Sequence, residues 1–439
     1  MKRWLVLLAA CGSPHTASDA PRADDTSPSS PDAPRGTPQL GASSELCKLL
    51  NNRNVSDPTA NDVQHRANLL GADLGISVDN AGAFYIFFGD SIGYAGIWGN
   101  GESHPDAVGY TADPTAMVLA DPQRLCTGLR IDTLPAASSI GPTVDPSVQA
   151  DFAAGSMTAP AGHMLDEYIH NPAGPANPHF ANLPGDFEVP SGAFAVGGAI
   201  YIFYTTVVST NDVTMKGSYL ARWAAPSPTS APAYDVLYAI DERFDASGPL
   251  HGDFVNIAAE VRDPYVYLFG TGAYRASPVH LARKLLSSLD TPGGFELYDA
   301  ASNTWVAPSQ SAAPLFGPAG FGETSVRYLP GVDRWMFLAE ESLPTSNRIV
   351  ARFADAPEGP WSDDITIHDM ADAAFTAHYC CAVDNQCAGE QFMNCDRTGF
   401  YGSYLLPGVQ AHGDGSFTVA YTLSSFDPYD VALFTTTFL

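Results

Sequence analysis

The chain has 439 residues, of which 45% are hydrophobic and 11% aromatic, so it has enough apolar surface for a sizeable core. It carries 21 Lys and Arg against 48 Asp and Glu, a net charge of −27 at pH 7, which argues against binding to nucleic acid or direct docking on an anionic membrane. With 39 Gly and 35 Pro, the composition favours many turns over long helices.

The first eleven residues are typical of a bacterial lipoprotein signal peptide. A short basic segment (MKR) precedes the apolar run WLVLLAA at 4–10, which is too short to span a bilayer. Cys11 follows in a sequence that resembles a lipobox, so we expect it to carry lipid; an ordinary signal peptide with a chance cysteine is the alternative. The mature protein is then an exported lipoprotein of the cell envelope, at the outer membrane or surface, that contacts the membrane only through its lipid anchor.

A linker is expected to follow the signal at 1–11. Residues 12–39 contain no Val, Ile, Leu, Met, Phe, Trp or Tyr, and a segment without such side chains cannot bury a core. We therefore expect a disordered linker over 12–41 and place the folded domain at 42–439.

Six cysteines remain in the folded domain of an exported chain, where disulfides can form. They are Cys47, Cys126, Cys380, Cys381, Cys387 and Cys395. We expect the first two to pair and close the first repeat. The other four lie in a polar insert at 380–395, where adjacent Cys380 and Cys381 should take different partners but the connectivity stays open. Zinc is the competing interpretation of the insert, although it lacks a CxxC pair and has only His378 beside it.

A short β-rich segment recurs five times, and each copy is rich in aromatic and β-branched residues. The copies are Ala83–Asp90, Ala199–Thr206, Tyr265–Thr271, Arg334–Glu341 and Ser416–Leu423. Five sheet units in series predict an all-β fold, a five-bladed β-propeller with long loop insertions, the largest over roughly 131–186. A β-sandwich is the alternative. Only 278–289 and parts of 57–70 have a pattern that resembles a helix.

Acidic residues stand next to glycines where the chain enters or leaves these segments. Asp73 precedes the first segment, Asp90 ends it, Asp253 precedes the third and Glu323 precedes the fourth. In a propeller such positions gather around the axis, where like charges shift each other's pKa. Hydrolysis of a glycoside needs one carboxylic acid to protonate the leaving oxygen and one carboxylate as base or nucleophile. Taken singly, an Asp beside Gly is more often a turn residue.

Motifs of other chemistries do not occur in the sequence. We find no HExxH, P-loop or dinucleotide fingerprint, and we expect neither a cofactor nor a metal. His163, His170 and His179 lie in the long insertion around Asp166 and Glu167 and could line a site or bind metal, but a solvated polar loop is the favoured interpretation.

Several short motifs, taken in order, resemble domain-of-unknown-function family 4185. They are Gly71-Ala-Asp-Leu-Gly75 and Phe87-Phe-Gly-Asp90, then Tyr267-Leu-Phe-Gly-Thr271 with Arg275 and Leu281-Ala-Arg283, then Gly322-Glu-Thr-Ser-Val326 with Arg334-Trp335, and last Tyr401-Gly-Ser-Tyr404 with Pro428-Tyr429-Asp-Val431. The resemblance runs from about 70 to 438. It implies a five-bladed propeller and the activity of glycoside hydrolase family 183, whose members are endo-acting D-arabinanases that cut α-D-arabinofuranosyl linkages, as in arabinogalactan and lipoarabinomannan.

The resemblance also implies the catalytic pair. Asp73 and Asp90, the acidic residues of the first blade, would be the catalytic carboxylates, and we expect Glu323 to assist them. Substrate-binding side chains are expected at Asp253, Arg275, Arg327, Tyr401 and Tyr429. The sequence departs from the family pattern at Phe426, where a Trp is expected, in the four-cysteine insert and in the 131–186 loop. These departures leave the substrate open.

Three classes of function stay open at this point. They are a surface-tethered furanosidase that cleaves a polysaccharide, a carbohydrate-binding propeller without catalysis, and a surface interaction scaffold. The presence of both Asp73 and Asp90 favours the enzyme, with one as general acid, the other as general base, and inversion at the sugar carbon. The expected partner is the polysaccharide substrate, without nucleic acid, and the chain is expected to be a monomer.

Overall fold

The computed structural model divides the chain into a unit Met1–Gly36 and a unit Thr37–Leu439, and the description below concerns the second. The described residues are 35–50, 61, 63, 69–93, 106–131, 134–135, 163–164, 187–209, 213–227, 234–242, 248, 250–344, 346–381 and 391–439. The expected lipidation site Cys11, most of the expected linker, Cys387, His170 and His179 lie outside them.

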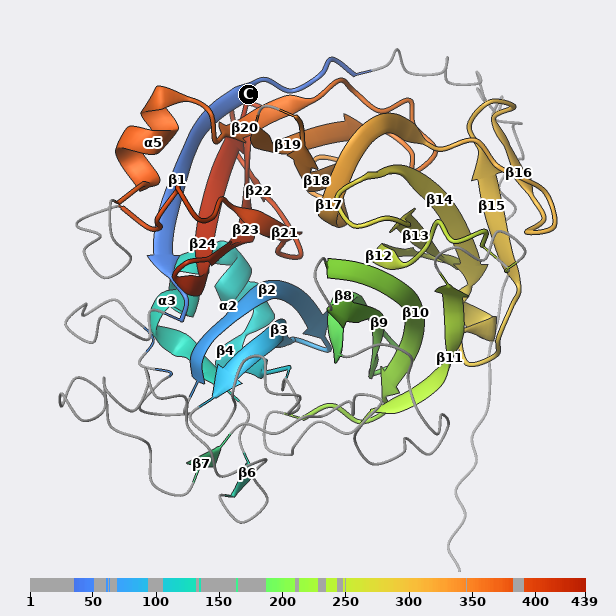
Figure 1. Cartoon of the computed structure of the whole chain (residues 1–439), viewed down its shortest axis with the longest axis horizontal. Coiled ribbons are helices and arrows are strands. Elements are labelled where there is room, and N and C mark those ends of the chain that lie inside the picture. The colour runs from blue at the N-terminus through green and yellow to red at the C-terminus, as the bar shows by residue number, and fades with distance from the viewer. Residues whose placement is uncertain are drawn as a thin grey trace, which may run out of the picture. The chain divides into compact units, whose positions relative to one another are not determined.

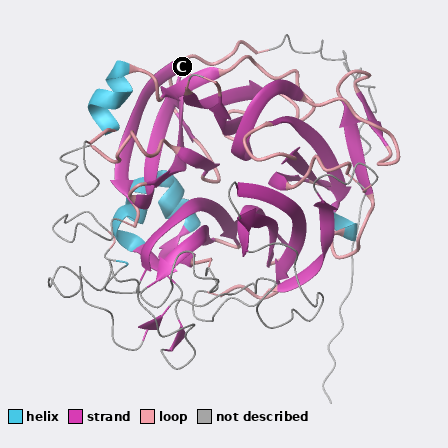
Figure 2. Cartoon of the chain, viewed as in Figure 1, coloured by secondary structure: helices cyan, strands magenta, loops and turns pink. Residues whose placement is uncertain are grey.

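Five β-sheet blades surround a common axis (Figure 1), and strands make up most of the regular structure (Figure 2). Blade 1 holds β2 (Leu69–Asn80), β3 (Ala83–Gly93), β4 (Val108–Pro114) and β5 (Leu129–Ile131), and blade 2 holds β8 (Phe187–Val196), β9 (Ala199–Ser209), β10 (Val213–Trp223) and β11 (Asp235–Glu242). Blade 3 holds β12 (Asn256–Arg262), β13 (Tyr265–Thr271) and β14 (Ser277–Leu285), extended by β15 (Phe295–Asp299) and β16 (Thr304–Val306). Blade 4 holds β17 (Phe316–Leu329), β18 (Arg334–Ser342), β19 (Asn347–Ala354) and β20 (Ile365–Asp369), and bridges between β14 and β17 join it to blade 3. Blade 5 holds β21 (Tyr401–Leu405), β23 (Phe417–Phe426), β24 (Tyr429–Phe438) and β1 (Leu40–Lys48), with β22 (Gln410–Ala411) paired to β23.

The remaining described elements are short. They are the helices α2 (Thr115–Ala120), α3 (Leu125–Gly128) and α5 (Ala373–Tyr379), the 3₁₀ turns η1 (Pro122–Arg124) and η3 (Leu286–Ser288), and the ribbon of β6 (Leu134–Pro135) and β7 (His163–Met164). No helix in the described part of the chain is both long and apolar enough to cross a membrane.

The five recurrent sequence segments form the second strand of each blade, and the fold is the five-bladed propeller that they predict rather than a sandwich. Their composition follows from burial on both faces. In β3, Phe84, Ile86 and Phe88 pack into one apolar cluster, whereas the alternate residues Tyr85 and Phe87 pack into another. A strand between two apolar layers reads as a continuous apolar run instead of an alternating one.

The innermost strands β2, β8, β12, β17 and β21 contact one another in succession around the axis. Each is less apolar than the strand behind it, and each carries polar residues near its N-terminal end. Examples are Asp73 in β2, Glu188 in β8 and Glu323 in β17. The N-terminal ends of these strands therefore place polar side chains at one end of the axis.

The two ends of the folded unit close the ring. β1 pairs antiparallel with β24, with Leu40 opposite Phe438 and Lys48 opposite Ala432, so blade 5 is built from both ends of the chain. The strand begins at Leu40, two residues before the boundary expected for the domain. Pairing with β1 covers the edge that β24 would otherwise expose.

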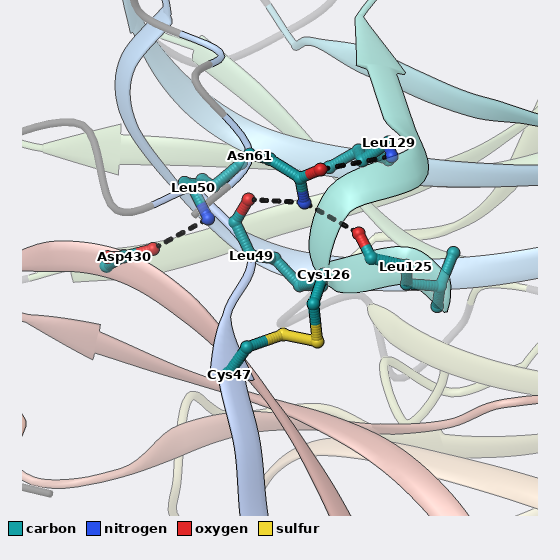
Figure 3. Close-up of a disulfide and its surroundings, with 8 residues drawn as sticks. All are labelled: Cys47, Leu49, Leu50, Asn61, Leu125, Cys126, Leu129 and Asp430. Carbon is teal, nitrogen blue, oxygen red and sulfur yellow. Dashed lines mark hydrogen bonds between the residues drawn. A yellow bond between two sulfur atoms is a disulfide. The ribbon is translucent and has the colours of Figure 1, made fainter. Parts of the chain in front are cut away.

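A disulfide fastens this closing strand to blade 1, as expected (Figure 3). Cys47 at the end of β1 bonds to Cys126 in α3. Beside it the buried Asn61 donates to the carbonyls of Leu49 and Leu125 and accepts from the backbone N–H of Leu129. Asn61 thus satisfies polar backbone groups on both sides of the seam, which would be costly to leave unpaired.

The described cysteines of the insert also form disulfides. Cys380 bonds to Cys395, and Cys381 is disulfide-bonded as well, so the two adjacent cysteines have different partners. In the described part of the chain no group of three or more His, Cys, Asp or Glu residues is arranged to hold a metal ion. The helical interpretation of 278–289 is wrong: this segment continues β14 and ends in η3, because its alternate residues pack against β13 and β15.

Candidate active site

The candidate active site lies where the N-terminal ends of the innermost strands meet. Asp73 of β2 accepts a hydrogen bond from the hydroxyl of Tyr401 of β21 at 2.9 Å. Arg275, in the loop after β13, pairs with Glu323 of β17 at 3.3 Å. Its guanidinium also lies 5.0 Å from the ring centre of Tyr401. These contacts bring residues of blades 1, 3, 4 and 5 into one group.

Asp73 is buried among groups that shift the pKa of its carboxyl in opposite directions. Asp73 is only 8% exposed, and this burial is the main reason that the pKa of its carboxyl rises from 3.8 to about 7. The negative charge of Glu323 raises the pKa further, whereas hydrogen bonding by Tyr401 and Tyr429 and the charge of Arg275 lower it. Atom Oδ1 of Asp73 makes no hydrogen bond within the described structure. Such a carboxyl can exchange a proton near neutral pH.

Asp90 stands beside Asp73 on the neighbouring strand β3. The strand register pairs Asp73 with Gly89, and a Cβ at Gly89 would lie 2.9 Å from Asp73 Oδ1. Burial and the charge of Asp73 raise the pKa of Asp90 well above its usual value. Both effects disfavour the ionised form of Asp90.

The backbone holds Asp90 in an unusual conformation. Its φ of 36° lies in the left-handed region, which an aspartate enters at an energetic cost. Its backbone N–H donates to Oδ1 of Asp106 at 3.1 Å, which supports the turn. Oδ1 of Asp90 has no hydrogen-bond partner in the described part of the chain. The strained turn and the unpaired oxygen both favour a functional role over a structural one.

Arg275 sits between two carboxylates. Besides Glu323 it contacts Oε2 of Glu340, a fully buried residue of β18, at 3.0 Å. Arg275 also has a positive φ, 49°, and its guanidinium lies 4.6 Å from the ring centre of Tyr274. Burial raises the pKa of Glu340 to about 7 despite the charge of Arg275. A single cation therefore faces two acids, and Arg275 is held in place from both sides.

The structure unites six of the eight residues predicted from sequence and leaves two elsewhere. Asp73, Asp90, Glu323, Arg275 and Tyr401 come together directly, and Tyr429 reaches Asp73 from β24. Arg327 instead donates to Glu260 and to the backbone carbonyls of Ser77 and Leu405. It follows Glu323 by four residues on the same strand, about 13 Å along the axis.

Asp253 is not joined to this cluster by any contact found in the structure. It lies in the loop before β12, and its carboxylate is 3.7 Å from His280 Nδ1. Burial raises its pKa, and the positive charge of His251 lowers it. The same loop holds the side chain of Asp241, which accepts the backbone N–H of Phe254. These contacts give Asp253 a position in the packing of blades 2 and 3.

Sequence reasoning missed several members of the site. Glu340 lies inside the recurrent segment of blade 4, where its apolar neighbours led the whole segment to be taken as core. Tyr404 was quoted only as part of a motif and Tyr274 not at all, yet burial and the charges of Glu323 and Asp73 raise the pKa of both. Asp106 lies in no motif. Its adjacency to Asp90 across blade 1 gives no sequence signal.

Comparisons with known proteins agree with the fold. The profile of the family described as Domain of unknown function (DUF4185) matches residues 59–435. A search of curated proteins finds no match. Among solved structures, a putative hydrolase from Bacteroides ovatus aligns with a TM-score of 0.51 at 12% identity, over 85% of this chain and 87% of that chain. At this identity the likeness supports the fold alone.

Two further structures are less similar. An exo-1,5-alpha-L-arabinanase from a bovine ruminal metagenomic library has a TM-score of 0.41 at 10% identity, over 85% of this chain and 94% of that chain. An alpha-L-arabinofuranosidase from Podospora anserina, in complex with cellotriose, has a TM-score of 0.43 at 12% identity, over 92% of this chain and 98% of that chain.

Proposed function

This chain belongs to the DUF4185 family, and we propose that it is a glycoside hydrolase that cleaves furanosidic linkages inside a polysaccharide, with D-arabinan of the arabinogalactan or lipoarabinomannan type as substrate. The observation that carries the proposal is the pair Asp73 and Asp90. Both are buried, both have a raised pKa, and they lie on adjacent strands at the centre of the propeller. The substrate follows from the activity that the family motifs imply.

The pair can divide the work of acid and base. In the proposed division, Asp73 is ionised above pH 7 and acts as the base, and Asp90, whose pKa is raised by burial and by the charge of Asp73, is the acid. Asp90 donates this proton to the glycosidic oxygen as the bond from that oxygen to the anomeric carbon breaks. Asp73 accepts a proton from a water molecule, whose oxygen forms the new bond to that carbon. The products are two sugar chains, and the configuration inverts.

The neighbouring groups would orient the reactants. Tyr401 fixes Asp73 through its hydrogen bond to Oδ2, which leaves Oδ1 to face the water. Glu323, held by Arg275, would orient that water or bind sugar hydroxyls. Each of these groups is preorganised by contacts already present in the free protein, so little reorganisation is needed on binding.

Product analysis tests the function. The protein is incubated with D-arabinan and, in parallel, with an L-arabinan and a xylan, and the products are separated by chromatography. Oligosaccharides from D-arabinan alone, formed with inversion as seen by ¹H NMR of the fresh products, would support the proposal. Their absence from Asp90→Asn would tie them to this site. Binding of D-arabinan without cleavage would indicate the non-catalytic propeller instead, and retention of configuration would refute the single-displacement step.

The location at the cell surface is a separate proposal. We propose that Cys11 carries lipid and tethers the propeller to the envelope, where it meets its polymeric substrate. The support is the apolar run that ends at this cysteine and the polar residues that follow it. Replacing Cys11 by Ser should move the protein from the membrane fraction to the soluble fraction, and an unchanged distribution would refute the anchor.

A further inference from the structure

The hairpin between β23 and β24 presents an exposed aromatic ring beside the carboxylates. Phe426 ends β23 and is 49% exposed, and no other phenylalanine in the described part of the chain is classed as exposed. It stands opposite Tyr429 in the strand register, and the centres of the two rings are 5.8 Å apart. Exposing a large apolar ring in water is unfavourable, so its position next to a candidate site needs a reason.

The hairpin tip is packed directly against the strand that carries Asp73. A Cβ at Gly71 would lie 2.6 Å from the backbone oxygen of Tyr429, so only glycine allows the two chains to approach this closely. Tyr429 also acts on the carboxylate itself, because its hydroxyl lowers the pKa of Asp73. Phe426 is therefore on a turn whose other end contacts a catalytic group.

Residues 394–398 hold this tip from the outside. The backbone N–H of Asn394 donates to the carbonyl of Asp427 at 3.1 Å, and Phe426 donates its own N–H to the hydroxyl of Thr398 at 3.0 Å. Arg397 forms an ion pair of 2.6 Å with the carboxylate of Asp427. Three links within two residues of the hairpin fix the backbone of Phe426.

The holding segment is itself anchored by the cysteine-containing insert. Phe392 and Met393 are buried in the core, and their backbone N–H groups donate to the carbonyl of Tyr379 at the end of α5. The disulfide between Cys380 and Cys395 then ties the start of the insert to the residue next to Asn394. The family motifs do not account for this insert, and its last part supports the hairpin. We call residues 394–398, together with the Cys380–Cys395 disulfide, the brace.

We propose that Phe426 is a platform on which a sugar ring of the polysaccharide stacks next to the catalytic pair, and that the disulfide-closed insert positions it. A furanose ring presents C–H bonds on its face, which pack favourably against an aromatic ring. The phenyl ring carries no charge, and Arg397 and Asp427 on either side of the hairpin tip neutralise each other, so a neutral carbohydrate ring fits this platform. This proposal rests on the proposed function for the identity of the polysaccharide.

Steady-state kinetics on D-arabinan tests the platform. Phe426→Ala should raise KM about tenfold with kcat nearly unchanged, because the ring binds the substrate and its transition state alike. Phe426→Trp should restore or lower KM. Leu285→Ala, which removes a side chain of similar exposure (42%) from blade 3, is the control and should change neither constant. A fall in kcat without a change in KM, or no change at all, would overturn the platform.

A double-mutant cycle tests the brace. Arg397→Met removes the ion pair to Asp427 and should raise KM about threefold without changing the melting temperature. If the brace acts only through Phe426, then Arg397→Met adds nothing to Phe426→Ala. The double substitution Cys380→Ser/Cys395→Ser should raise KM by a similar factor, measured below its lowered melting temperature, and should also add nothing to Phe426→Ala. Additive effects on KM would refute positioning through Phe426.

A binding measurement separates this proposal from the proposed function. Retardation of the Asp90→Asn protein in a native gel that contains D-arabinan reports binding in the absence of turnover. If the parent chain cleaves nothing but Phe426→Ala abolishes retardation, the hydrolase proposal fails and the platform stands. If the parent cleaves D-arabinan and Phe426→Ala is retarded like its parent, the platform fails and the hydrolase stands.

Discussion

The two ends of the propeller axis are built from the same blades but differ in how fully their buried charged side chains are hydrogen-bonded. At the far end Arg327 of β17 is satisfied by Glu260, Ser77 and Leu405, from three neighbouring innermost strands. At the near end, Asp73 lies four residues before Ser77 on β2, and Asp90 lies beside it on β3. A carboxylate oxygen of each remains without a hydrogen bond inside the described structure. The distance between the ends is only about 13 Å.

This difference separates a structural charge from a functional one. A buried arginine whose donors meet a carboxylate and two carbonyls fixes neighbouring blades together and has nothing left to offer a ligand. Buried carboxylates without such partners carry a desolvation cost that stability alone does not explain. The near end is thus preorganised for a substrate that supplies the missing partners.

The largest effect is expected at the near end. Asp73→Asn and Asp90→Asn should each lower kcat by about 10²-fold or more on a substrate that the parent cleaves, the usual scale for the loss of acid–base catalysis. Circular dichroism should show an unchanged fold. Asp414→Asn, in the exposed turn before β23, is the control and should keep full activity. Near-normal activity of either variant would show that its residue is not catalytic.

The far end should respond in stability instead. Arg327→Met leaves Glu260 buried without its cation and should lower the free energy of unfolding by about 3 kcal/mol, measured by urea denaturation. The folded fraction should keep its kcat/KM. Arg275→Met makes the matched test at the near end, where activity should fall more than stability. If Arg327→Met lost activity but kept its full free energy of unfolding, the proposed difference between the two ends would be contradicted.

How far the sequence could define these ends depends on the range of the contacts. Asp73 and Asp90 could be predicted as a pair because the family motifs imply them and both belong to the first blade, 17 residues apart. Glu340 was not, because its partner Arg275 comes from another blade, 65 positions earlier in the chain. Nor does the sequence reveal at which end of a strand Arg327 would be satisfied, since that depends on carbonyls of two other blades.

The closure of the ring shows the same limit. The five strong segments predicted the blades, because burial on both faces leaves a local composition signal. β1 has the sequence LGASSELCK, which carries little β signal, and becomes a strand only because β24 offers an unpaired edge. The pairing of Cys47 with Cys126 was nevertheless predictable, because the other four cysteines fall within one short insert.

Removing the near-end charge should change how stability depends on pH. The pKa of Asp73 is about 7 when folded and near 3.8 when unfolded, so the folded state binds the proton more tightly. The Asp73 carboxyl therefore adds most to the free energy of unfolding below pH 3.8, and this contribution is lost as the pH rises to about 7. Asp73→Asn should therefore stabilise the protein by about 4 kcal/mol at pH 8 relative to its effect at pH 4. Urea denaturation at both pH values measures this, and equal effects at the two would contradict it.

The smallest expected effect concerns the hydrogen bond that Tyr401 gives to Asp73. This bond stabilises the ionised carboxylate and lowers its pKa, so Tyr401→Phe should raise the pKa of Asp73. Asp73 must be ionised to accept the proton of water. In the pH profile of kcat/KM, the ascending limb should therefore move to higher pH by about one unit.

A second tyrosine of blade 5 provides the control for this shift. Tyr421 is also fully buried, but its hydroxyl bonds with Ser43 and Thr436 on the outer strands of the blade. Tyr421→Phe should leave the ascending limb where it is, although it removes the same atom. The phenylalanine at 401 keeps the aromatic ring that faces Arg275, so a shift would report the hydroxyl alone. A limb that stays in place in Tyr401→Phe, or that moves to lower pH, would show that Asp73 is not the group whose ionisation starts the reaction.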